Sequence, residues 1–296
     1  MSARAHIQKT LILVAMAVFL TATTGILSGP PLKALRVKLG RGPFVLTFAG
    51  LTTLFLGLGW TIGAITFFVM SFFIAVFVEF DERGEELFYS GLYATLFSMV
   101  LVTIGFGVWM AKTGSEWVGH LTSGAQAIID QYTGAGIIAE ATISARDLLV
   151  QAPSAVVIVL LISLLLALVF ENGIHLWAGL PLIKRRGLKD FRLPEATIWV
   201  LIGSMAAAYV KHDIKWLQAV SVNLFHICLL IYFFQGLAVT SYFFTTFRVS
   251  RLWRVVWMAI LVLQLFLFVS VLGLLDYWVD FRGWFLKKSA QLDKKV

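Results

Sequence analysis

The chain has 296 residues, of which 59% are hydrophobic and only 14% are charged. A soluble domain carries about a quarter charged residues, so this composition excludes an ordinary water-soluble enzyme or binding domain. The formal net charge is +8, but lysine and arginine lie in short segments between apolar runs, as they do in membrane proteins. We therefore expect a lipid bilayer, and no nucleic acid, as the partner of the basic residues.

Charge-free apolar runs divide the chain into candidate membrane-spanning helices. One crossing needs about 20 apolar residues, and the run 42–78 is long enough for two, with Gly57-Leu58-Gly59 as the expected turn. The runs predict an all-α, polytopic transmembrane helical bundle of about eight crossings, formed by residues 9–28, 43–58, 60–79, 87–111, 153–178, 195–210, 217–245 and 252–277. Residues 1–296 then form a single integral membrane domain, which we expect in the inner (plasma) membrane of the cell.

Clusters of lysine and arginine predict how the helices are oriented. The densest clusters lie at residues 33–41, 83, 184–192 and 248–254, and we place them on the cytoplasmic side. The basic tail that begins at Arg282 is expected on the opposite side. The acidic turn from Glu79 to Glu86 is expected to be a solvated loop between two helices.

A longer connection, residues 113–152, separates two of the predicted crossings. Apolar residues recur in it at helical spacing, beginning with Trp117, Leu121 and Ala125, and polar residues such as His120 lie between them. This pattern predicts an amphipathic segment that lies in the membrane interface. The alternative is a loop that acts as a lid over a cavity.

Seven polar residues within or at the ends of the crossings are candidates for substrate binding, because polar groups in hydrocarbon are costly and often functional. They are Glu171, Asn172, Asn223, His226, Gln235, Asp276 and Asp280. Asn223 and His226 are three apart on one helix face, and we expect them to face the bundle interior together with Glu171 or Asn172. Gln235 is expected to face a different neighbour.

Each candidate also has a structural interpretation. Buried amide and imidazole groups can join helices through hydrogen bonds instead of binding a ligand, and Glu171 can form a hydrogen-bonded pair with His175. Asp276 or Asp280 can pair with Arg282 at the end of the last helix. Two carboxylates four residues apart could alternatively hold a cation or a proton.

The sequence shows no motif of a hydrolase, a nucleotide-binding protein or a zinc site. Its single cysteine, Cys228, cannot form an internal disulfide or a CxxC metal site. We therefore expect no enzymatic activity, no catalytic or metal-binding residues and no cofactor. Any transport would draw its energy from a partner or an ion gradient.

Several segments of the C-terminal half occur in an order that is typical of one bacterial family. They are Gln151-Ala-Pro-Ser154, Glu171-Asn172, Ile183-Lys-Arg-Arg-Gly187, Phe191-Arg-Leu-Pro-Glu195, Asn223, Gln235-Gly-Leu-Ala-Val239, Leu272-Gly-Leu-Leu-Asp276 and Asp280-Phe-Arg282. In this order the chain resembles the YybS-like bacterial membrane proteins, the domain-of-unknown-function 2232 family. The resemblance covers about residues 148–282, and more faintly Pro31 to Gly42.

That family is similar in fold to the S-components of energy-coupling-factor vitamin transporters. The likeness implies a helical cavity for a small molecule, and a membrane coupling protein or ATPase module as a partner; as a likeness of fold it does not establish transport. The residues that match family positions, and would line or brace the site, are Asn172, Asn223, Gln235, Asp276 and Asp280.

We expect transport-related binding of a small solute, of unknown identity, in a cavity between the predicted helices 153–178, 217–245 and 252–277. Such a cavity would be polar and partly hydrated. The alternative is a non-transporting membrane scaffold that holds envelope or division partners, whose interior could be apolar throughout.

Overall fold

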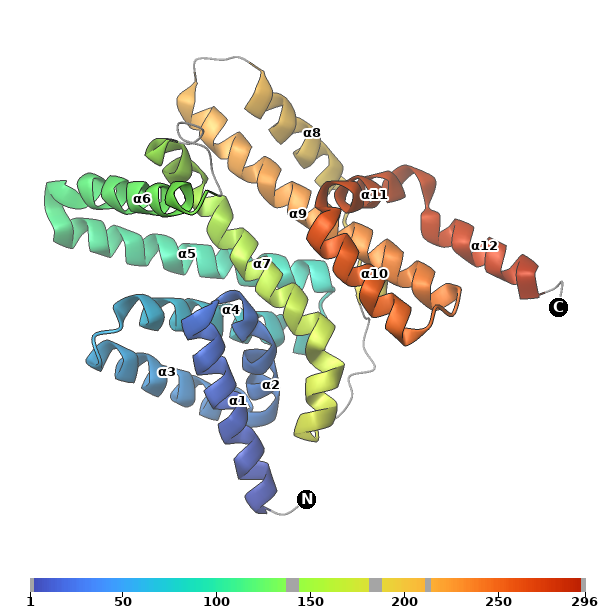
Figure 1. The fold of residues 1–296 in the computed structure, drawn as a ribbon, viewed down its shortest axis with the longest axis horizontal. Helices are drawn as coiled ribbons and strands as arrows, with labels where there is room; N and C mark the ends of the chain where they lie inside the picture. Colours follow the sequence, from blue (N-terminus) through green and yellow to red (C-terminus); the bar gives the residue numbers. More distant parts are fainter. Residues whose placement is uncertain (1–2, 137–143, 181–187, 211–213, 294–296) are drawn as a thin grey trace.

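The computed structural model describes residues 3–136, 144–180, 188–210 and 214–293 (Figure 1). Every regular element in these ranges is a helix, which confirms the predicted all-α, polytopic helical bundle. All predicted helices except the last have a single counterpart in the structure. The helices form two groups on either side of the long, central α7, and they are described in chain order below.

The first group contains the N-terminal helices (Figure 1). They are α1 (Ala3–Thr23), α2 (Gly29–Leu39), α3 (Arg41–Gly57), α4 (Thr61–Glu82) and α5 (Leu87–Thr113). The predicted turn between α3 and α4 is confirmed, because Gly59 takes a φ of 76° there and the two helices pack against each other. The ring of Phe55 closes the hairpin on Trp60, at 4.9 Å between ring centroids.

The sequence predicts no helix at α2, since residues 33–41 are interpreted as a basic loop. In the structure Gly25 takes a φ of 66° just after α1, and Pro30 and Pro31 stand in the first turn of a new helix. Proline suits this position because its fixed φ is helical and its missing N–H would have no partner there. Residues 29–36 of α2 are all buried, among α1, α4 and α7.

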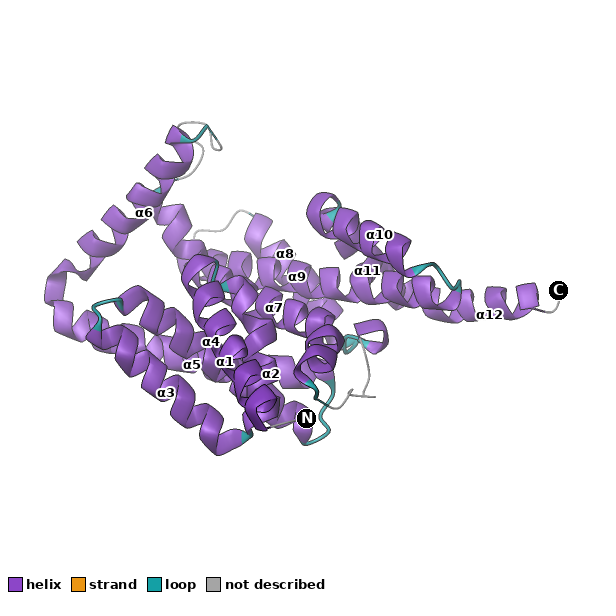
Figure 2. Ribbon diagram, turned by 60° about the horizontal axis from the view of Figure 1, so that its bottom comes forward, coloured by secondary structure: helices purple, strands orange, loops and turns teal. Residues whose placement is uncertain are grey.

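The segment 113–152 contains the whole of one helix and the start of another. A short 3-10 turn (Gly114–Glu116) leads into α6 (Trp117–Gly134), which turns back from α5 toward α7 (Figure 2). The more buried residues of α6 include Trp117, Leu121 and Ala125, in agreement with the amphipathic pattern; its depth in a membrane stays a prediction. The apolar positions at 137–143 lie outside the described residues.

Helix α7 (Ala145–Ala178) begins earlier than the predicted residue 153, and this boundary was wrong. The helix starts in a capping box, in which Ser144 and Asp147 bond each other's backbone N–H groups. Such a box satisfies two N–H donors that an open helix end would leave unpaired. Pro153 therefore lies inside the helix and not at its start.

The second group contains the C-terminal helices, α8 (Ala196–Tyr209), α9 (Lys215–Thr246), α10 (Arg251–Gln264), α11 (Phe266–Val279) and α12 (Phe281–Asp293). The last predicted helix, 252–277, is broken in two, with an angle of 101° between α10 and α11. Because of this break, α11 lies along α9, and α12 continues away from the bundle (Figure 2).

Four helical segments among the described residues are long and apolar enough to cross a membrane, and the bent α10–α11 pair would make a fifth. The four are Thr61–Glu82, Leu87–Gly134, Ala145–Ala178 and Lys215–Thr246. Two shorter apolar helices, Ile7–Thr23 and Ala196–Tyr209, also correspond to predicted crossings. The count of about eight therefore includes segments that are shorter than a full span.

Helix α7 takes part in both major hydrophobic cores. Leu160 and Leu164 belong to the core shared with α1–α4, whereas Val157, Leu161 and Leu165 belong to the core shared with α9 and α11. Within each set the residues recur every four positions, so each set forms a stripe along the helix, and the two stripes lie side by side on it. The sides of α7 thus join the two groups of helices.

The backbones of α9 and α11 come into close contact where two glycines meet. A methyl group on Gly236 would collide with the carbonyl oxygen of Val269, and one on Gly273 would collide with the carbonyl oxygen of Tyr232. Small residues let helices approach closely in a membrane, where no hydrophobic effect drives them together. The two glycines therefore fix how α11 sits on α9.

We predict that Gly236→Ala destabilises the protein by about 1–3 kcal/mol, because the added methyl group forces the two helices apart. Thermal unfolding of the purified chain in mild detergent would measure this loss. The matched control is Gly203→Ala in α8, where an added Cβ meets nothing within 4 Å. Equal stability of the two variants would contradict the close approach of α9 and α11.

Candidate functional site

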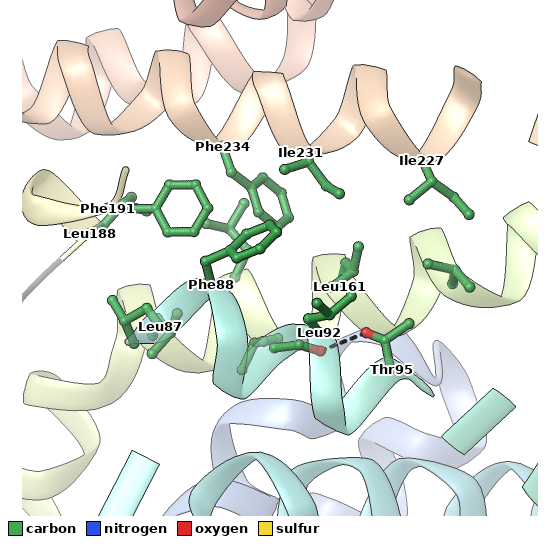
Figure 3. Close-up of a pocket in the computed structure, with 15 residues that line it drawn as sticks. Leu87, Phe88, Leu92, Thr95, Leu161, Leu188, Phe191, Ile227, Ile231 and Phe234 are labelled. Atoms are coloured by element: carbon green, nitrogen blue, oxygen red, sulfur yellow. Dashed lines mark hydrogen bonds between the residues drawn. The ribbon is translucent and has the colours of Figure 1, made fainter. Parts of the chain in front are cut away.

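An elongated, partly enclosed cavity of about 90 Å³ lies between α5, α7 and α9. Fifteen of the described residues line it: Leu87, Phe88, Gly91, Leu92, Thr95, Val157, Leu161, Leu164, Leu165, Leu168, Leu188, Phe191, Ile227, Ile231 and Phe234 (Figure 3). Along α7 the lining extends from Val157 to Leu168, a distance of about 16 Å at 1.5 Å per residue. The 3-10 turn Leu188–Asp190 and Phe191 contribute from the chain that precedes α8.

The lining offers almost nothing to a polar ligand. Among the lining residues that the structure describes, only Thr95 has a hydrogen-bonding side chain, and its hydroxyl donates to the carbonyl oxygen of Gly91 at 2.8 Å (Figure 3). Cavities with apolar walls stay dry and accept apolar guests. None of the seven residues proposed from the sequence lines this cavity, so its chemistry differs from that of the polar site expected between α7, α9 and the last helix.

Asn223 joins α9 to the backbone of α7. Its Oδ1 accepts a hydrogen bond from the N–H of Ser154 at 2.8 Å, and its Nδ2 donates to the carbonyl oxygen of Val150 at 2.7 Å. Those two groups would bond each other in a regular α-helix, next to Pro153, which has no N–H to give. The Asn223 amide is thus inserted into the backbone ladder of α7.

Asn223 does not lie with Glu171 or Asn172. It bonds the first half of α7, whereas Glu171 and Asn172 lie near the other end of that helix. His226 is half-buried one turn beyond Asn223, and Asn172 is exposed. The structure therefore does not bring these four residues into one site, because the axial length of α7 separates them.

Gln235, which was expected to face a different neighbour from Asn223 and His226, lies with Asp276 in one buried network. The Nε2 of Gln235 donates to Oδ2 of Asp276 at 3.0 Å, and its Oε1 accepts from the N–H of Leu193 at 3.1 Å. Oδ1 of Asp276 accepts from the N–H of Phe281 at 3.2 Å. The contact of α9 with α11 puts the two side chains side by side, since Gln235 precedes Gly236 and Asp276 follows Gly273 by three residues.

Arg282 completes this network and was missing from the set of predicted site residues. Its Nε lies 3.6 Å from Oδ2 of Asp276, and its two terminal nitrogens donate to the carbonyl oxygens of Lys189 at 3.2 Å and Phe191 at 2.7 Å. Burial lowers the pKa of the Arg282 guanidinium, and the Asp276 carboxylate opposes that shift. The expected pairing of Asp276 with Arg282 is therefore present.

The position of Arg282 corrects the expected orientation of the tail. We expected the tail on the side opposite residues 184–192, yet Arg282 bonds the backbone of residues 189 and 191. Asp280, mostly exposed, also lies 3.9 Å from Arg192. The break between α10 and α11 is the reason, because an unbroken final helix would have carried the tail to the far side.

Glu171 belongs to a second charged cluster. Its carboxylate lies 2.7 Å from Nζ of Lys33, which is almost fully buried in α2. One turn along α2, the buried Arg36 pairs with Glu79 at 3.3 Å and with Glu82 at 3.4 Å. The acidic turn expected to be a solvated loop is thus partly buried against α2, because burying a cation requires a paired anion.

These observations define a polytopic helical membrane protein with an apolar cavity and buried polar groups that connect its helices. A family model described as "Predicted membrane protein (DUF2232)" matches residues 9–277, and the chain belongs to that family. Neither the curated proteins nor the solved structures give a significant match. The family expected from the C-terminal motifs is therefore confirmed over more of the chain than residues 148–282, and the likeness to S-components stays a prediction.

We predict that Asn223→Leu lowers the stability of the protein by about 1–3 kcal/mol, because it leaves backbone groups of α7 without partners. Thermal unfolding in detergent would measure the change. Gln218→Leu is the matched control, since it makes the same kind of change at an exposed position of α9. If Asn223→Leu were as stable as this control, the amide would not complete the α7 ladder.

We predict that Arg282→Ala costs about 3–5 kcal/mol, because removing one member of a buried ion pair strands the other in a poorly hydrated site. Arg192→Ala should cost at most about 1 kcal/mol, because Arg192 and Asp280 form an exposed pair. Denaturation of the two variants in the same detergent would compare them. A loss as small in Arg282→Ala as in Arg192→Ala would contradict the buried network.

Proposed function

We propose that this membrane protein binds an elongated hydrophobic molecule, of the acyl-chain or isoprenoid-chain class, in the cavity between α5, α7 and α9. The single observation that supports this function most strongly is the cavity lining, which is apolar along about 16 Å of α7. The proposal keeps the small-solute binding expected from the sequence and changes the chemical class of the solute from polar to apolar. It involves no enzymatic reaction.

The size and walls of the cavity suit such a chain. A volume of about 90 Å³ corresponds to about six to nine water-sized spheres, so part of a hydrocarbon chain has room to enter. Each buried methylene group contributes about 0.8 kcal/mol relative to water. A chain that comes from lipid gains less from burial, so close packing against Leu161, Ile231 and Phe234 must supply the preference for the cavity.

The bilayer itself offers a route to the cavity. Leu92 of α5 lines the cavity and is 38% exposed, and the cavity is only partly enclosed, which supports an opening beside α5. A hydrophobic molecule dissolved in the membrane can therefore reach the cavity past α5 without crossing water. Its release would draw on a membrane coupling protein or ATPase module, the partner that the family resemblance implies, in the inner (plasma) membrane.

A scaffold for envelope or division partners is the second candidate function. It is favoured by the use of Asn223, Gln235 and Asp276 in bonds within the chain. Side chains that already form hydrogen bonds within the chain are not available to bind a polar solute. A scaffold would show no saturable binding of hydrophobic chains.

We predict that Leu161→Trp reduces saturable labelling by a photoreactive fatty acid by about tenfold, because the indole fills the cavity. The fatty acid would carry its reactive group on the chain, and competition with excess oleate would separate saturable labelling from contact with bulk apolar surface. Cross-linked peptides of the unmodified chain should map to the lining of α5, α7 and α9.

Val169→Trp is the matched control, since Val169 is exposed on the same helix and its replacement leaves the cavity unchanged. Both variants would be compared by thermal unfolding, so that loss of labelling is not confused with loss of the fold. Labelling that oleate does not reduce, or that is equal in the two variants, would overturn the proposed function and favour the scaffold.

A further inference from the structure

We propose that Phe191 limits the length of the hydrophobic chain that the cavity accepts, and that Arg282 is the positioning residue that holds Phe191 in place. This inference rests on the proposed function and names the residue that sets its specificity. The argument starts from the shape of the cavity, then considers what holds its end wall.

Phe191 lies across one end of the cavity. In Figure 3 its ring points from the segment before α8 toward Phe234 and Phe88, whereas Ile227 and Thr95 line the opposite end. The lining at the first end comes from residues that are far apart in the sequence, and Phe191 is the largest side chain that the 188–191 segment contributes. A chain that enters from the Ile227 end would therefore meet this ring.

Helical walls are held by their own backbone bonds, but the segment of Phe191 is not part of a long helix. Its position depends on side chains from α9 and α12. Arg282 donates to the carbonyl oxygens of both Lys189 and Phe191, and Gln235 accepts from the N–H of Leu193. Three bonds from two helices thus fix the backbone on both sides of the Phe191 ring.

The guanidinium is itself fixed, because Arg282 is only 3% exposed and its Nε lies beside the Asp276 carboxylate. Arginine presents several N–H donors in a rigid plane, so the terminal nitrogens of Arg282 can donate to two carbonyl groups while its charge pairs with the Asp276 carboxylate. A ring mounted on such a segment cannot move back when a longer chain arrives. The end wall therefore acts as a fixed stop.

The test measures which fatty acids the full chain retains, by native mass spectrometry of the detergent-purified protein with a series of saturated acids from octanoate to stearate. The unmodified chain should bind up to a limiting length. Phe191→Ala should move the limit to longer acids and raise the ratio of bound stearate to bound decanoate by about tenfold, as expected for about two more buried methylene groups. Phe191→Leu should give a smaller shift.

Arg282→Lys tests the positioning role. Lysine keeps the positive charge beside Asp276 but lacks the planar set of N–H donors that bonds the carbonyl oxygens of Lys189 and Phe191. It should move the limit in the same direction as Phe191→Ala, which a merely structural role would not do. Arg192→Gln, a change in the exposed pair with Asp280, should leave the limit unchanged. Binding of decanoate shows that each variant keeps a folded cavity.

The outcomes separate the inference from the function on which it rests. If Phe191→Ala binds decanoate and keeps the original length limit, the stop is elsewhere and the inference fails while the hydrophobic-chain function stands. If Phe191→Ala shifts the limit and Arg282→Lys does not, the positioning role fails. If the unmodified chain binds no acid of the series, the proposed function and this inference are both overturned.

Discussion

The contact of two helix backbones at Gly236 and Gly273 organises the C-terminal half of the molecule. Because the glycines have no side chains, α11 settles onto α9 at a fixed position along it. That position puts the amide of Gln235 beside the carboxylate of Asp276. The carboxylate in turn holds Arg282, which bonds the segment that closes one end of the cavity. A steric fit in one place therefore determines a polar network, and the network determines the shape of an apolar site.

The apolar cavity and the polar network use different side chains of the same helices. Asn223, Gln235 and Asp276 form their hydrogen bonds where helices meet, so these groups avoid the free-energy cost of unpaired burial. The surface left for a ligand is then made of leucine, isoleucine, phenylalanine and one valine, together with Gly91 and Thr95 of α5. This division explains why a protein with several buried ionisable groups nevertheless presents a hydrocarbon-like site.

The sequence predicts the helices well where the signal is local. Charge-free runs locate α3 to α5, α8 and α9, and paired glycines locate the α3–α4 turn. The sequence does not predict α2 or the break between α10 and α11, because these conformations depend on residues far away in the chain. In α2, for example, Lys33 forms an ion pair with Glu171 of α7. Gln235 and Asp276 are buried in the interior, whereas Asn172 and Asp280 are exposed. The sequence does not show which residues pair, because the partners lie tens of residues apart, as Gln235 and Asp276 do. The cavity itself has no sequence signal, because its apolar residues resemble those that face lipid.

The insertion of Asn223 into α7 has a consequence for the order of assembly. Most transmembrane helices form all of their backbone hydrogen bonds within the helix, before neighbouring helices are present. In α7, the turn around Pro153 instead uses the side-chain amide of Asn223, which lies 69 residues after Ser154. At about 5–20 residues per second, the ribosome supplies that amide roughly 3–14 s later. In that interval the first turns of α7 must find other partners, such as interfacial water. The helix is thus finished by a later helix, and a chain truncated before α9 would leave it incomplete.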